Sequence, residues 1–127
     1  MQIQRRSFLL LLLCVFFALP LHAETNVSGH YAGGQGNQVT IQLSVAAPPP
    51  AAFIVLQHLP AGVQLVNASP APSGFNGRQV KWLFKHPHTG GTTISMQLSK
   101  PVAANQLRGE IRFRHPKNGD MFKKQIK

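Results

Sequence analysis

Apolar and polar residues alternate in short runs along most of the chain. In residues 39–45, valine, isoleucine and leucine take every second position, with threonine, glutamine and serine between them. An extended strand with this pattern turns one face to a core and the other to water. Further runs of strand type occupy residues 53–59, 63–66, 79–85, 93–98, 107–114 and 122–126. The run at 53–59 is apolar without alternation, which is typical of a central strand.

Proline and glycine separate these runs. Residues 48–50 are three prolines, which end a strand because proline has no N–H to donate, and residues 67–77 read as a loop. Asn118-Gly119 predicts a tight hairpin turn with positive φ at both residues. About seven strands at this spacing, without a helical period after the N-terminal segment, predict an all-β fold. We expect an immunoglobulin-like Greek-key β-sandwich of about seven strands, with an open barrel as the alternative.

The single tryptophan lies in an alternating run. Val80, Trp82 and Phe84 share one face of the run at 79–85, and lysines with Leu83 form the other face. A tryptophan among apolar neighbours is typical of a core, where it buries about 200 Å². We therefore assign Trp82, Phe84 and Phe113 to the core between two sheets. Stacking of Trp82 on a ligand is the alternative.

The N-terminus divides the chain. Residues 1–23 combine Arg5 and Arg6, an apolar stretch at 7–19 and a small residue at Ala23, which is the pattern of a secretory signal peptide. The apolar stretch is shorter than the roughly 20 residues of a membrane span. We expect cleavage and no transmembrane span afterwards, with a retained anchor as the alternative. Residues 24–38, polar and rich in glycine, then read as a flexible leader, and residues 39–127 as one immunoglobulin-like domain.

Cleavage would place the protein in the periplasm or outside the cell. It would also remove Cys14, the only cysteine, so the remaining chain could form no intramolecular disulfide. The chain carries 13 Lys and Arg against 3 Asp and Glu, a formal charge of +10. Losing Arg5 and Arg6 would lower this charge by two, to +8. Such a charge attracts anionic partners.

Several motifs between residues 39 and 113 resemble a known family. They are Leu59-Pro60-Ala61-Gly62-Val63, the residues 66–69, Val80-Lys81-Trp82, and Gly90-Gly91 before the alternating residues 92–98. This arrangement is similar to bacterial immunoglobulin-like domains of exported cell-surface proteins, and cohesin-like domains share its general look. The resemblance implies a non-enzymatic module used in surface assembly or adhesion. Its motifs concern turns and core, so it implies no particular ligand.

The basic residues gather near the C-terminus. The candidate anion- or partner-binding residues are Arg108, Arg112, Arg114, Lys117, Lys123 and Lys124. Arginine suits bidentate contacts to carboxylate, sulfate or phosphate. We expect a protein partner, or an anionic polysaccharide or lipid surface. Nucleic acid is disfavoured because we expect the protein to be exported and because no aromatic residues lie between these cations on the same face of the strand. The alternative is that the cations only protect a sheet edge from pairing with other chains.

Histidines offer a second chemistry. His86, His88 and His115 could hold copper or zinc, although their spacing matches no closed zinc site. Catalysis is disfavoured because the only carboxylates are Glu24, Glu110 and Asp120, and no serine lies in a nucleophile motif. We therefore expect an exported binding or assembly module that is not an enzyme and needs no cofactor. The alternatives are a periplasmic metal-binding protein and an accessory subunit of a surface fibre.

Overall fold

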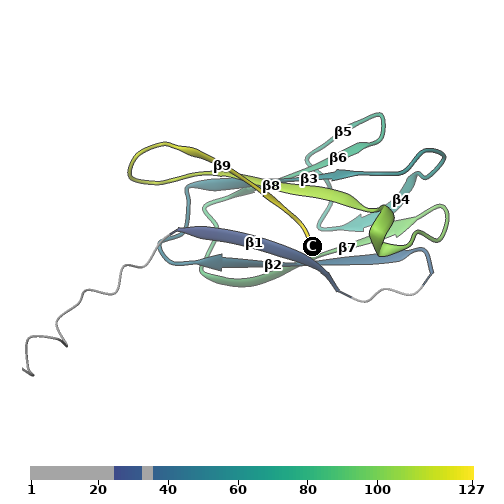
Figure 1. Ribbon diagram of the computed structural model, residues 1–127, viewed down its shortest axis with the longest axis horizontal. Coiled ribbons are helices and arrows are strands. Elements are labelled where there is room, and N and C mark those ends of the chain that lie inside the picture. The colour runs from purple at the N-terminus through teal and green to yellow at the C-terminus, as the bar shows by residue number, and fades with distance from the viewer. Residues whose placement is uncertain (1–24, 33–35) are drawn as a thin grey trace, which may run out of the picture.

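The computed structural model describes residues 25–32 and 36–127, and within them two antiparallel sheets face each other (Figure 1). The proposed signal peptide lies outside the described residues. Sheet A has four strands in the order β1-β2-β7-β4, and sheet B has five in the order β5-β6-β3-β8-β9. The predicted all-β sandwich is confirmed, with nine strands in the described chain rather than about seven. The finer immunoglobulin-like, Greek-key description stays a prediction.

The strands follow the predicted runs closely between residues 38 and 58 and again from residue 79 onward. Their bounds are β1 Asn26–Ala32, β2 Gln38–Ala46, β3 Ala52–His58, β4 Leu65–Ser69, β5 Gly74–Asn76, β6 Gln79–Lys85, β7 Gly90–Leu98, β8 Arg108–Arg114 and β9 Met121–Gln125. A 3₁₀ turn, η2 (Ala104–Gln106), precedes β8. Among the described residues, no helix is long and apolar enough to cross a membrane.

One hydrophobic core fills the space between the sheets. Alternate residues of β2, β7 and β8 are buried, as period two requires. Trp82 on β6 is the largest buried side chain, 1% exposed, and its indole N–H donates to the Pro70 carbonyl at 2.9 Å. Phe113 is also buried, whereas Phe84 is half-buried and stacks on Phe53 with ring centroids 4.7 Å apart. The burial of Trp82 leaves no face of its ring for a ligand.

The first strand lies where the sequence predicts a flexible leader. Asn26–Ala32 forms β1 and pairs with β2 over its whole length, from Asn26 opposite Ala46 to Ala32 opposite Thr40. Its inward residues are Val27, Gly29 and Tyr31, so glycine interrupts the apolar period. A Cβ on Gly29 would lie 3.0 Å from side-chain carbons of Leu43 and Ile111. Gly29, one of the glycines on which the predicted flexible leader was based, is therefore a position of close packing.

The middle of the chain also differs from the expectation. The strand predicted at 63–66 begins later, because Val63 closes a turn by donating its N–H to the Pro60 carbonyl at 3.1 Å. β4 runs from Leu65 to Ser69 with an irregularity between Leu65 and Asn67 that breaks the period. The loop predicted at 67–77 contains the three-residue strand β5, which pairs with β6. A strand this short carries too few residues to show a period.

Most connections cross from one sheet to the other. Only the pairs β1–β2, β5–β6 and β8–β9 are neighbours both in sequence and in a sheet. The links from β2 to β3, β3 to β4, β4 to β5, β6 to β7 and β7 to β8 all change sheet. This interleaving holds the two sheets to one core, and it places the β8–β9 hairpin at one edge of sheet B (Figure 1).

Candidate functional site

The β8–β9 hairpin presents its basic side chains on the outside of the sandwich. Leu107, Gly109, Ile111 and Phe113 point into the core, so the residues between them point outward. Arg108, Arg112 and Arg114 therefore share one outer surface, and Lys123 lies directly opposite Arg112. Like charges opposite each other on neighbouring strands repel. The strand pattern thus concentrates positive charge in one place.

The hairpin turn differs from the predicted two-residue type. His115 N–H donates to the Asp120 carbonyl at 2.8 Å, so four residues, 116–119, form the loop. Gly119 has a φ of 75°, while Asn118 lies outside the positive-φ region. The Asn118 side chain instead accepts a hydrogen bond from the Asp120 N–H at 3.0 Å. Lys117 is exposed in this loop.

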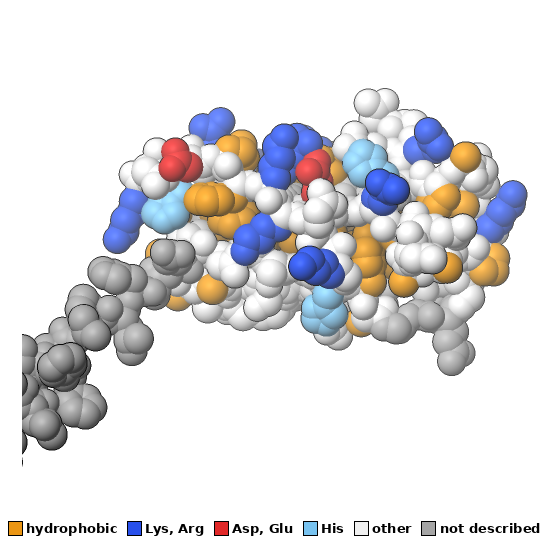
Figure 2. Space-filling model, viewed as in Figure 1, with side chains coloured by type: hydrophobic (Ala, Val, Ile, Leu, Met, Phe, Trp, Pro, Cys, Tyr) orange, Lys and Arg blue, Asp and Glu red, His pale blue; other side chains and the backbone are white. Residues whose placement is uncertain are grey.

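A further strand of sheet B, β6, extends the positive surface. On the outer side of sheet B, Lys81 of β6 lies in one cross-strand row with Leu56 of β3 and Glu110 of β8, and Lys85 lies opposite Ala52 at the start of β3. We call this surface the cationic face: Lys81, Lys85, Arg108, Arg112, Arg114 and Lys123. Figure 2 shows Lys and Arg side chains distributed over the face of the molecule in view, with few acidic side chains among them.

The centre of the cationic face is apolar. The register places Arg112 beside Ile54 and Ile54 beside Leu83, and the next row holds Leu56. Leu56 is only 7% exposed although it points outward, whereas Leu83 is 38% exposed. Long cationic side chains around a shallow apolar centre give a surface that can make both ionic and apolar contacts.

One carboxylate lies within the cationic face. Glu110 Oε1 accepts hydrogen bonds from Arg112 Nη2 at 2.5 Å and Arg112 Nε at 3.0 Å. This is the only ion pair in the part of the chain that the structure describes. The other cations of the face therefore have no carboxylate partner within residues 25–32 and 36–127.

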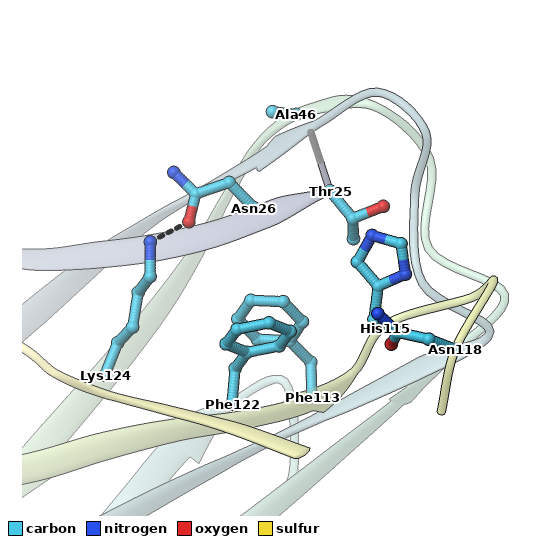
Figure 3. Close-up of a pocket in the computed structure, with 8 residues that line it drawn as sticks. All are labelled: Thr25, Asn26, Ala46, Phe113, His115, Asn118, Phe122 and Lys124. Carbon is cyan, nitrogen blue, oxygen red and sulfur yellow. Dashed lines mark hydrogen bonds between the residues drawn. The ribbon is translucent and has the colours of Figure 1, made fainter. Parts of the chain in front are cut away.

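Lys124 takes part in a different surface. It pairs with Ile111 across the hairpin, so its side chain points to the inner side of β9, and its Nζ donates to Asn26 Oδ1 of β1. This bond spans a cleft of about 520 Å³ between β1 and β9 (Figure 3). The residues lining it are Thr25, Asn26, Ala46, Phe113, His115, Asn118, Phe122 and Lys124.

Two stacked phenyl rings form the apolar part of this cleft. Phe113 and Phe122 lie with ring centroids 5.4 Å apart and planes at 23°, and His115 is 6.3 Å from Phe122 (Figure 3). Phe122 points inward yet is 40% exposed, because sheet A does not cover it within the described residues. The cleft therefore combines an accessible aromatic surface with a lysine and an imidazole.

The candidate metal ligands are not brought together. His86 and His88 line a second cleft of about 500 Å³ beside Leu83 and Phe53, while His115 lines the cleft of Figure 3. Among the described residues, no group of three or more His, Cys, Asp or Glu side chains could hold a metal ion. His86 has a φ of 50°, so it serves the turn between β6 and β7.

A buried polar pair supports the start of β8. Gln57 of β3 is fully buried, and its amide accepts a hydrogen bond from the Tyr31 hydroxyl at 2.7 Å and donates to the Arg108 carbonyl at 3.2 Å. Burial raises the pKa of Tyr31 to about 12, because the charged phenolate is disfavoured in the core. The pair links β1, β3 and β8 behind the cationic face.

Of the six cations proposed from the sequence, four share the cationic face, Lys117 lies in the hairpin loop and Lys124 faces the cleft. Sequence reasoning missed Lys81, Lys85 and the apolar centre. The outward position of Lys81, Leu83 and Lys85 on β6 was visible in the sequence, but their place beside β8 depends on strand order.

Comparison with protein-family models, with curated proteins and with solved structures found no significant match. The resemblance to bacterial immunoglobulin-like domains therefore stays a prediction. The function has to be argued from the surface of the molecule itself.

Proposed function

We propose that the protein is an exported binding module, without enzymatic activity, that holds an anionic partner on its cationic face. The partner is an acidic protein or an anionic surface polymer, and the site of action is the periplasm or the cell exterior. The single observation that carries the proposal is the cross-strand gathering of six cations around one carboxylate on the outer side of sheet B.

The energetics of the face favour an anionic partner. Arg112 and Lys123 lie opposite each other, and Arg114 continues the same side of β8, so like charges repel across the strands. A bound carboxylate or sulfate would relieve this repulsion and could receive two N–H groups from one guanidinium. Edge protection alone accounts for Lys123 on the edge strand β9 but not for Lys81, which lies on β6 between β5 and β3.

Binding to immobilised heparin tests the proposal at the level of charge. We expect the protein to be retained at low salt and released as salt rises, because ionic contacts are screened. Arg114→Glu should be released at lower salt. The slope of log affinity against log salt should become shallower by about one for each ionic interaction that the substitution removes.

Lys100→Glu is the matched control. It makes the same change in net charge at an exposed position that follows β7 of sheet A. An equal effect of Arg114→Glu and Lys100→Glu would mean that only net charge matters, and it would contradict a binding site on the cationic face. Both variants should unfold at the temperature of the parent protein.

A further inference from the structure

The backbone of β9 has unpaired groups along its outer edge. Ile126 N–H donates to the Gly109 carbonyl at 2.9 Å, and His115 N–H donates to the Asp120 carbonyl at 2.8 Å. Even-numbered residues of β9 therefore exchange hydrogen bonds with β8, and the N–H and C=O groups of Met121, Lys123 and Gln125 point away from it. The described residues provide these groups with no hydrogen-bond partner.

The end of the chain shows what this edge can bind. Lys127 N–H donates to the Gly29 carbonyl at 3.3 Å, and Tyr31 N–H donates to the Lys127 carbonyl at 2.8 Å. The tail after β9 thus pairs with β1 as in a parallel ladder and joins the two sheets at that point. Towards Met121 the two strands separate, and the cleft of Figure 3 occupies the space between them. The cleft is wedge-shaped, with β1, an edge strand of sheet A, along one side and β9, an edge strand of sheet B, along the other.

The two sides of β9 carry different chemistry. Phe122 points into the cleft with Phe113 behind it, whereas Lys123 points to the cationic face beside Arg112. A strand lying along β9 would turn alternate side chains to these two sides, because its side-chain period is two. Apolar residues would contact Phe122, and acidic residues between them would face Lys123 and Arg112.

We propose that β9 binds an extended acidic segment of a partner protein by strand addition, with apolar and acidic residues in alternation. The inference rests on the proposed function and names the class of anionic partner. Main-chain bonds to Met121, Lys123 and Gln125 supply affinity, and the Phe122 side of the cleft supplies selectivity for apolar side chains. Charge decides against a second copy of this chain, whose formal charge is +10.

The probe is a synthetic peptide of about seven residues in which glutamate and valine alternate, the length of an ordinary strand. Its binding to the purified protein is measured by fluorescence anisotropy. A control peptide has the same composition with glutamates and valines in separate blocks. We expect the alternating peptide to bind at least about fivefold more tightly, because only it can bond the edge and fill both sides.

The matched variants are Lys123→Pro and Lys123→Ala. Both remove the same charge, but proline also removes an N–H that β8 does not use, and edge strands tolerate proline. Lys123→Pro should bind the alternating peptide about fivefold more weakly than Lys123→Ala, while both elute equally from heparin. If Lys123→Pro fails to fold, two N-methylated forms of the alternating peptide replace it. One form is methylated at the odd-numbered amides of the peptide and the other at the even-numbered amides. We expect one form to lose binding and the other to retain it.

The outcomes separate the two proposals. Equal binding of the block peptide, or equal binding by the two Lys123 variants, would overturn strand addition and leave the heparin result intact. If Arg114→Glu loses heparin retention and the parent protein binds neither peptide, strand addition is likewise overturned and the heparin result stands. A dimer that Lys123→Pro dissociates would assign the edge to a second copy and also overturn the proposal.

Discussion

Gln57, a fully buried amide on the otherwise apolar inner side of β3, has its hydrogen-bonding groups satisfied by Tyr31 and by two backbone carbonyls, those of His58 and Arg108. Burying an amide without hydrogen-bond partners would cost about 1–3 kcal/mol, so the buried Gln57 side chain depends on these partners. Gly109 makes room for it: a Cβ there would lie 2.7 Å from the Tyr31 hydroxyl and 2.8 Å from Gln57 Oε1.

Gly109→Ala should therefore lower the free energy of unfolding by about 1–3 kcal/mol, because the added methyl group displaces side-chain atoms of Tyr31, Gln57 and Ile126. Denaturant titration measures the change. Gly91→Ala is the matched control: its Cβ would lie 3.7 Å from the nearest atom, an ordinary contact, in β7. Equal stability of the two variants would contradict the close packing at Gly109.

Tyr31 should titrate abnormally. Its pKa of about 12 in the folded protein exceeds the ordinary 10.0, so folding favours the protonated hydroxyl. The contribution of Tyr31 to stability is fully present below pH 10 and is lost as the pH rises towards 12, since the unfolded chain ionises first.

Phenolate absorbance measures this directly because the chain has one tyrosine. We expect a midpoint near 12 in the native protein and near 10.0 in denaturant. The contribution of Tyr31 to stability is taken as the difference in unfolding free energy between the parent protein and Tyr31→Phe at each pH. A native midpoint near 10.0 would show that the hydroxyl is not buried.

At the scale of elements, the sequence predicts strands well where branched and aromatic residues alternate. β6 occupies 79–85 as expected, and β2 and β8 lie within a residue or two of their predicted bounds. β1 was missed because Gly29 interrupts its inward period between Val27 and Tyr31. β4 was misplaced because a turn uses Val63, although that residue is buried. Local pattern cannot distinguish a glycine that loosens the chain from one that another strand packs against.

A substitution in β1 tests whether this strand belongs to the folded core. Val27→Ala should lower the free energy of unfolding by about 2 kcal/mol, because Val27 is fully buried between the sheets. Ser28→Ala, at the next and exposed position, should leave it within about 0.5 kcal/mol of the parent value. Equal urea midpoints for both variants would mean that residues 26–32 are a leader after all.

At the scale of the whole molecule, composition predicts the sign of the surface charge but not its distribution. Period two places Arg108, Arg112 and Arg114 together, and the sequence shows this directly. Strand order decides that Lys81 and Lys85 belong to the cationic face. The position of Lys124 on the inward side of β9 places it in the cleft instead. Both follow from contacts between segments far apart in the chain, which no local pattern contains.

The interleaved connections also govern how a growing polypeptide reaches this structure. β2 and β4 are both partners of β7, and β3 lies between β6 and β8, so sheet A is incomplete until residue 98 has been made and sheet B until residue 125. A nascent or truncated product ending before β7 would hold apolar strands with no opposing layer, a state that aggregates readily. Folding must therefore await nearly the whole polypeptide, and contacts so distant in sequence form slowly.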